Sequence, residues 1–571
     1  MPDGHSLNPF TTPDQPTLGQ VLDAIEADKA LPLQRRRNLC SSLRTLGKLM
    51  GRDPRYLPGH PRFYRDFFKH LHPEQCGLTK KRISNIKSDV LFALRHTGCI
   101  GNGHSYMAPQ TFEWQALSDQ AIGFGRIRFY LSRLMRFCSA NNIPPNAVND
   151  QISERFLKAL IDESFVKDPI KTHQNICKLW NRAVKEVPGW PIIKLTVPRY
   201  KKTYTTPLEA FPKSFRDEVD SYFDKCAGKD ILDDQGPSKP MKPKTIQSRR
   251  YRLRQIVSGL LHQGWKTEDI TTLSQIVQVD AAKLSLRYYL DRSDNKKTSQ
   301  THSLAVLIKT IAKHWICVDE DHLKALGDLC KKVEPDTKGM TSKNRGRLRQ
   351  FDDPKNVRLL LDFPALQVDE VLRHDRELRR DAVAVQIALV VEILLMAPMR
   401  ASNLVNLNIK RHIQRTRAGK NGVVHIVIPA EEVKNNEAIE FALPPETARL
   451  LDLYLRDYHP RLTDGPCPWL FPGKSNKAKS REVLGDQVSK HVFKATGLHV
   501  NLHLFRHIAA KLYLDQNPGG YEVCRRILGH RSMDTTTRFY AGMETAAAGR
   551  HFDEQILKLR RSLRKGSGGD R

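Results

Sequence analysis

Two side chains near the C-terminus, His530 and Tyr540, are of types that can react with a phosphate. They lie in the stretch "LGHRSMDTTTRFYAG", which runs from Leu528 to Gly542. A tyrosine hydroxyl can act as a nucleophile, and an imidazole can exchange a proton or hydrogen-bond an oxyanion. A lone tyrosine is far more often a packing residue, so the assignment depends on partners elsewhere in the chain.

Three residues upstream could supply such partners. Arg400 follows a predicted buried helix in "APMRASNLVNL", and His503 and Arg506 are one helical turn apart in "NLHLFRHIAAKLYLD". Considered singly, Arg400 could cap the dipole of its helix, and the other two could belong to a solvated face. Together they favour a phosphodiester site, because a guanidinium offers paired donors in one plane for the non-bridging oxygens.

The same residues indicate how a tyrosine would be activated. An unperturbed tyrosine has a pKa of about 10, so it needs cationic neighbours to attack as a phenolate. Two arginines and two histidines could provide them. The sequence has neither a carboxylate pair typical of two-metal catalysis nor a Walker lysine loop, so we expect chemistry without a metal or other cofactor.

The order and separation of Arg400, the His503–Arg506 pair, His530 in "LGH" and Tyr540 resemble the active-site signature of tyrosine recombinases, the phage integrase family. The resemblance covers the C-terminal part of the chain. The preceding helical segment is similar to the core-binding, SAM-like domain of that family. The family implies a DNA breaking and rejoining enzyme with chemistry like that of type IB topoisomerases.

The resemblance also implies a role for each residue. Tyr540 would attack the scissile phosphate to form a 3′-phosphotyrosyl link, while Arg400 and Arg506 hold the non-bridging oxygens. His503 would act as acid or base, and His530 would hydrogen-bond the phosphate.

A lysine on a β-hairpin usually protonates the leaving 5′-oxygen in this family. Lys434 in "EEVKNNE" matches it, because it lies between the two predicted strands, and Lys420 is a competitor. Two positions depart from the family pattern. Asn403 stands where an acidic residue commonly supports the first arginine, and Tyr540 is one residue further from His530 than usual.

The fold expected from periodicity is mainly α with a small antiparallel sheet. The alternating segments "VVHIVIPA" and "EAIEFALP" predict a hairpin, and "AVAVQIALVVEILLMA" predicts a buried core helix rather than a membrane span. Three similar helical segments precede this α+β catalytic domain and could be copies of one module. The expected division is a flexible N-terminus at 1–30, helical modules at 31–110, 120–210 and 240–335, and the catalytic domain with its C-terminal helix at 345–571.

The charge balance points to a polyanionic partner. Lysine and arginine exceed aspartate and glutamate by 31, which favours double-stranded DNA over a membrane. The side chains expected to contact DNA are basic residues of the predicted helical modules: Lys80, Lys81, Arg82, Arg249, Arg250, Arg252, Arg254, Lys296 and Lys297. The ten cysteines include no CxxC pair, which is typical of a reducing compartment. We expect this compartment to be the cytoplasm of a bacterium, with the protein associated with the nucleoid.

The resemblance to tyrosine recombinases implies a site-specific recombinase of integrase or transposon type, acting through a Holliday junction. We expect a homo-oligomer, with a dimer on one recombination site and a tetramer in synapsis, which other recombinases could join. The segment "AAAGRHFDEQILKLRRSLRK" would be a helix donated to a neighbouring protomer or docked on its own domain. Two alternatives stay open: a hairpin telomere resolvase with the same chemistry, and a non-catalytic DNA-binding accessory protein on the same fold.

Overall fold

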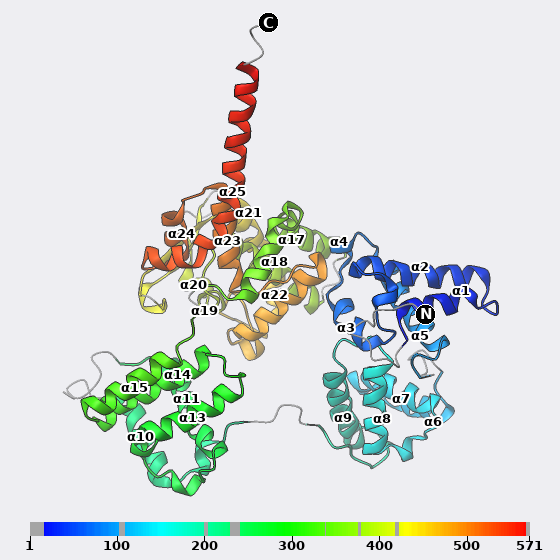
Figure 1. The fold of residues 1–571 in the computed structure, drawn as a ribbon, viewed down its shortest axis with the longest axis horizontal. Helices are drawn as coiled ribbons and strands as arrows, with labels where there is room; N and C mark the ends of the chain where they lie inside the picture. The colour runs from blue at the N-terminus through cyan, green and yellow to red at the C-terminus, as the bar shows by residue number, and fades with distance from the viewer. Residues whose placement is uncertain are drawn as a thin grey trace, which may run out of the picture. The chain divides into compact units, whose positions relative to one another are not determined.

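A computed structural model describes residues 16–101, 109–198, 204–228, 240–336, 339–374, 378–416, 422–434 and 436–566 (Figure 1). The chain divides into two units, one formed by residues 1–198 with 340–571 and the other by residues 199–339. The structure is mainly α-helical with one small antiparallel sheet, as predicted. No helix among the described residues is long and apolar enough to cross a membrane.

Two helical clusters with separate hydrophobic cores occupy residues 18–100 and 114–195 of the first unit. The first contains α1 (Leu18–Ala27), α2 (Leu33–Met50), α3 (Pro61–His70), α4 (Pro73–Cys76) and α5 (Lys80–His96). The second contains α6 (Phe112–Gln120), α7 (Arg126–Ala140), α8 (Asp150–Asp162) and α9 (Pro169–Glu186). Trp114 and Trp180 are completely buried in the second core.

Helix α1 lies in the segment that the sequence assigned to a flexible N-terminus, so that assignment does not hold for residues 18–27. Thr17 begins the helix with a capping box to Gln20, which satisfies two free backbone donors. Leu18, Val21 and Ile25 share one face and are at most 1% exposed. The segment is ordered because this apolar face completes the first core.

The second unit has one core, made by α10 (Lys213–Cys226), α11 (Pro243–His262), α12 (Leu273–Val277), α13 (Val279–Asp291), α14 (Ser299–Ile311) and α15 (Glu320–Lys332). The predicted packed face of α14 is confirmed, since Leu304, Ile308 and Ile311 are at most 1% exposed. Trp315, the fourth residue of that pattern, is partly buried, and its indole N–H donates to Glu218 at 2.8 Å.

The helices follow one another in a similar order in each of the three helical clusters. In each, a leading helix (α1, α6 or α10) precedes the three helices of the repeat expected from the sequence. Descent of the three from one module stays a prediction, as do the domain limits at 31–110, 120–210, 240–335 and 345–571.

The C-terminal part of the first unit is an α+β domain whose core spans residues 340–540. Its longer helices are α17 (Pro354–Arg373), α18 (Arg379–Met396), α22 (Arg481–Thr496), α23 (Leu504–Gln516) and α25 (Met533–Gly566). Shorter helices are α16 (Ser342–Leu348), α19 (Ala401–Val405), α20 (Ile409–His412), α21 (Pro445–Leu453) and α24 (Tyr521–Leu528). Helix α18 is the predicted buried helix, and its one interior amide, Gln386, donates to the Tyr454 hydroxyl at 2.8 Å.

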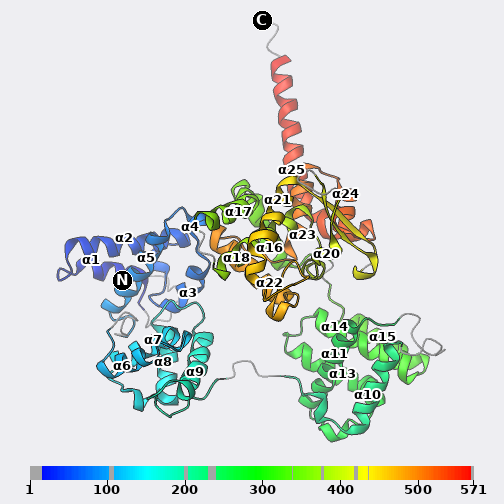
Figure 2. The same ribbon diagram turned by 180° about the vertical axis from the view of Figure 1, so that it is seen from behind.

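The sheet contains the strands β1 (Ile413–Arg415), β2 (Val424–Ile428) and β3 (Ile439–Leu443), paired antiparallel in that order (Figure 2). Val424, Ile426 and Ile428 alternate with more exposed residues and are at most 2% exposed, which confirms the predicted hairpin of β2 and β3. Helix α25 follows the domain, and its C-terminal half extends away from the other helices in both views (Figures 1 and 2).

Candidate active site

Arg506 is the most buried charged residue of the predicted site, at 5% exposed near the start of α23. Its Nη1 donates to the carbonyl of Pro398 at 2.7 Å, and its Nη2 donates to the carbonyl of Leu528. These bonds join the segment after α18 to the end of α24, two regions far apart in the sequence. Burial, reinforced by Arg400, lowers the pKa of Arg506 to about 10, so the guanidinium remains charged at neutral pH.

Arg400 lies in the turn that links α18 to α19, as its place after the predicted buried helix implied. It is half-buried, and this burial lowers its pKa while the carboxylate of Glu437 opposes the shift. The charge of Arg400 also disfavours the protonated form of Arg506, which means that two guanidiniums share one low-dielectric region. An anion bound there would interact favourably with both charges.

His530 lies directly after Gly529, which ends α24 in the left-handed conformation at φ 57°. Its Nε2 is 3.4 Å from Nη2 of Arg506, and its Nδ1 is 2.9 Å from the hydroxyl of Thr536. Because a guanidinium only donates, Nε2 is the acceptor and Nδ1 carries the proton of the neutral ring. Burial and the two arginines lower the pKa of His530 to about 4.

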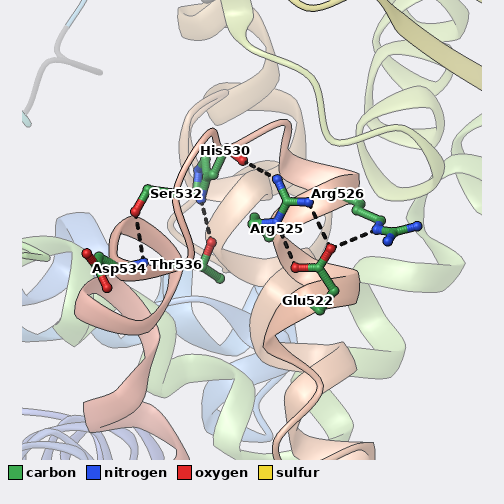
Figure 3. A network of polar contacts seen from close by, with 7 residues as sticks. All are labelled: Glu522, Arg525, Arg526, His530, Ser532, Asp534 and Thr536. Atoms are coloured by element: carbon green, nitrogen blue, oxygen red, sulfur yellow. Dashed lines mark hydrogen bonds and ion pairs between the residues drawn. The ribbon is translucent and has the colours of Figure 1, made fainter.

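A charged network on α24 holds the backbone of His530 in place (Figure 3). Arg525 donates to both carboxylate oxygens of Glu522 at 2.7 and 2.8 Å, and donates to the carbonyl of His530 at 3.0 Å. Arg526 also donates to Glu522, at 2.8 Å. The sequence analysis missed this network, although the i, i+3 and i, i+4 spacing of these charges on one helix indicates such pairs.

His503 immediately precedes α23 and is exposed at the surface of the domain. Its ring lies 5.1 Å from the ring of His507, edge to face. Partial desolvation, with the charges of Arg506 and Arg400, lowers the pKa of His503. A neutral imidazole at this position could accept a proton at neutral pH.

Tyr540 is in the first turns of α25 and is 1% exposed. Its hydroxyl is 3.0 Å from Nδ1 of His507, and burial raises its pKa above the ordinary value although Arg506 opposes this. The sequence analysis did not identify His507 as a site residue. Its i, i+4 spacing from His503 and its place directly after Arg506 were the available signals.

The predicted lysine is not brought to the other residues by any described contact. Lys434 is exposed in the turn between β2 and β3, after a short 3₁₀ turn at Ala430–Glu432, and Lys420 lies outside the described residues. Asn403, the departure from the family pattern, is 6% exposed, and its side-chain nitrogen has no hydrogen-bond partner among the described residues.

A cavity of about 460 Å³ opens between β3 and α24. Its charged and titratable walls are formed by Arg506, Arg525, Arg526, His530, Glu437 and Glu440. The three arginines outnumber the two glutamates among these six residues. The cavity is therefore suited to an anionic group such as a phosphodiester.

Some of the residues expected to contact DNA instead have partners inside their own domain. Arg254 donates to the carbonyls of Thr206 and Thr205, each at 2.9 Å, so it stabilises the fold of the second unit. Arg250 forms a 2.6 Å ion pair with Asp220.

Arg82 donates to the hydroxyls of Ser42 and Ser41, each at 3.1 Å. Arg249 and Arg252 are half-buried on α11. The exposed members of the predicted set are Lys80, Lys81, Lys296 and Lys297.

Comparison with known proteins supports the family assignment for this part of the chain. Residues 363–546 match the model of the phage integrase family, and they include Arg400, Arg506, His530 and Tyr540. These residues form a phage integrase family domain, and the resemblance to tyrosine recombinases is confirmed. No curated protein matches the chain.

Several solved structures of recombinases are similar to the chain. The XerA recombinase is 16% identical, covering 59% of this chain and 99% of its own, with a TM-score of 0.24. The XerH site-specific recombinase bound to a difH substrate is 17% identical, covering 60% and 99%, with a TM-score of 0.36. The Tn1549 transposon integrase in complex with circular intermediate DNA is 14% identical, covering 56% and 94%, with a TM-score of 0.33.

Proposed function

We propose that this protein is a site-specific DNA recombinase that cuts and rejoins double-stranded DNA through a 3′-phosphotyrosyl intermediate. The observation that supports this most directly is the convergence of Arg400, Arg506 and His530 with Tyr540, which come from three separate regions of the chain. The phage integrase family match covers all of them.

The proposed reaction is an exchange of phosphodiester bonds. The Tyr540 oxygen attacks phosphorus, the bond from phosphorus to the 5′-oxygen breaks, and the leaving oxygen takes a proton from Lys434. Arg400 and Arg506 stabilise the negative charge on the non-bridging oxygens in the transition state, where such fixed charges have their largest effect. With the phosphate bound, His530 carries its proton on Nε2 and donates it in a hydrogen bond to the phosphate in place of its contact with Arg506. His503 accepts the tyrosine proton and returns it on rejoining.

The hydrogen bonds of Arg506 support its role in this scheme. Backbone carbonyls hold the guanidinium on two sides, at Pro398 and Leu528, so its direction is set before any substrate binds. A donor that needs no reorganisation during the reaction lowers the barrier more than a mobile one.

The proposed partners are double-stranded recombination sites and further copies of this chain. The surplus of 31 positive charges supports binding to a polyanion. Helix α25 exposes Phe552, Ile556 and Leu559 by 65%, 40% and 55%, and we propose that a neighbouring protomer covers this face in the tetramer. A chain ending at residue 549 should then keep DNA binding but lose tetramers in light scattering with DNA, whereas tetramers of normal stability would contradict the proposal.

A nicked suicide substrate tests the chemistry. Cleavage near the nick releases a short fragment, so the covalent adduct cannot be religated and accumulates. The wild-type chain should form an adduct that mass spectrometry maps to Tyr540, and Tyr540→Phe should form none while binding DNA equally well. Absence of an adduct on DNA that the wild-type protein demonstrably binds would contradict the enzymatic function and favour a DNA-binding role.

A further inference from the structure

The hydroxyl of Tyr540 has a defined partner in the protein without DNA, and that partner is none of the residues expected from the family signature. The Tyr540 hydroxyl oxygen lies 3.0 Å from Nδ1 of its partner, His507. The two rings meet edge to face with centroids 5.7 Å apart, and the ring of Phe539 stacks on His507 at 6.0 Å. Both side chains of the pair are buried, Tyr540 at 1% exposed and His507 at 5%.

The burial of His507 and the groups around it determine the direction of this hydrogen bond. Burial, reinforced by His503, Arg506 and His530, disfavours a second proton on its ring and lowers its pKa to about 4. His507 is therefore neutral at physiological pH and can accept the phenolic proton at Nδ1. Tyr540 in turn stays protonated, because burial raises its pKa.

This arrangement is unsuited to attack on DNA. A phosphorus atom within a duplex cannot approach a hydroxyl whose side chain is 1% exposed, and a protonated phenol is a poor nucleophile. The hydroxyl must leave Nδ1 of His507 and turn towards the two arginines before it can react. A bound phosphodiester favours that change, because its negative charge offsets the repulsion among the cations there.

We propose that His507 is a positioning residue that holds the Tyr540 hydroxyl inside the protein until DNA occupies the site. The inference rests on the proposed role of Tyr540 as nucleophile. It adds a step to the reaction, the exchange of a hydrogen bond to His507 for contact with the scissile phosphate. Without DNA, this hydrogen bond protects the tyrosine from other electrophiles.

Nitration by tetranitromethane measures how accessible the Tyr540 side chain is in the full-length protein, because the reagent attacks accessible and ionisable tyrosines. Mass spectrometry then gives the extent of nitration at each tyrosine. Tyr130, 49% exposed, serves as the reactive reference, and the fully buried Tyr454 serves as the protected one. In the wild-type chain without DNA, Tyr540 should react as slowly as Tyr454. Nitration of Tyr540 as fast as that of Tyr130 would overturn the proposal.

Two substitutions at one position separate the hydrogen bond from the shape of the side chain. His507→Leu removes the acceptor, and we expect Tyr540 to be nitrated about fivefold to tenfold faster, the effect of losing one hydrogen bond. His507→Asn places an amide oxygen near the position of Nδ1 and should keep the slow rate. Equal rates for both variants would overturn the proposal.

Phe539→Leu is the matched control, since it alters the ring contact of His507 but leaves the hydrogen bond. Slow nitration of Tyr454 in every variant shows that the domain is folded. If Tyr540 is protected as expected but forms no adduct with a suicide substrate, the hydrogen bond from Tyr540 to His507 stands, whereas the recombinase function fails and with it the role of that bond in the reaction.

Discussion

Glu522 and Arg525 lie one turn apart on α24 and form an ion pair with two hydrogen bonds, of 2.7 and 2.8 Å (Figure 3). The remaining nitrogen of Arg525, Nη1, donates to the carbonyl of His530, and the backbone N–H of His530 donates to the carbonyl of Arg525 at 2.9 Å. The pair thus determines where the chain turns after α24, and with it the position of the His530 ring.

Removal of the Glu522 carboxylate should slow DNA cleavage without unfolding the domain. In Glu522→Gln, Arg525 loses its charged partner and holds His530 less firmly, so we expect adduct formation to be about tenfold slower in single turnover, because small misplacements of catalytic groups are costly. Arg526→Gln is the control, since it removes only the second arginine from Glu522. The two substitutions change the net charge in opposite directions, so an equal loss in both variants would contradict a specific role of the Glu522–Arg525 pair in positioning His530.

Replacement of Arg506 by lysine should affect both stability and activity. An ammonium cannot donate to the Pro398 and Leu528 carbonyls in the geometry of the guanidinium, and unsatisfied buried groups cost about 1–3 kcal/mol in the free energy of unfolding. Adduct formation should fall by about 10²–10³, the usual loss for one oxyanion donor. Chemical denaturation and the suicide substrate measure the two effects.

Arg400→Lys is the comparison for that experiment. Arg400 is only half-buried, so its replacement should lower activity with a smaller change in the denaturation midpoint. A larger loss of stability in Arg400→Lys than in Arg506→Lys would contradict the assignment of Arg506 as the more deeply embedded of the two.

Stability should decline in acid through the histidines of the site. The pKa of His507 and that of His530 are about 4 in the folded protein, below the ordinary value of about 6.5, so the unfolded chain binds more protons between these limits. The contribution of these two neutral histidines to the free energy of unfolding is complete above pH 6.5 and is lost as the pH falls towards 4. His507 alone changes the free energy of unfolding by up to about 1.4 kcal/mol per pH unit in this window.

Denaturation midpoints measured from pH 7 to pH 4 test this. His507→Asn should give a shallower decline than the wild-type protein, and substitution of the exposed His314 should leave the slope unchanged. A decline that is as steep in His507→Asn as in the wild type would show that other groups dominate the acid dependence.

Exposed lysines and internally bonded arginines should differ in their effect on DNA binding. We expect the double change of Lys80 and Lys81 to glutamine to weaken binding and to reduce the slope of log K against log salt by about 0.9 for each phosphate that is no longer neutralised. Arg254→Gln should instead destabilise the second unit, because its two carbonyl acceptors lose their donor. Titration at several salt concentrations and thermal unfolding separate these outcomes.

Local patterns in the sequence determine a large part of this protein. The apolar run of α18 has no polar face to present to water, so the sequence alone predicts that this helix is buried. In β2, apolar and polar residues alternate, which directs every second side chain inward. The residue types and order of Arg400, Arg506, His530 and Tyr540 likewise suffice to indicate a phosphate-reactive site.

Only the tertiary structure decides which side chains have partners inside the protein. Arg254 and Lys80 both belong to basic runs within a helix, yet one donates to two carbonyls and the other is exposed. The bond from Tyr540 to His507 joins residues 33 positions apart, and the bond from Arg506 to Pro398 joins residues 108 apart. Such bonds depend on how helices pack against one another, which helical periodicity within each segment does not specify.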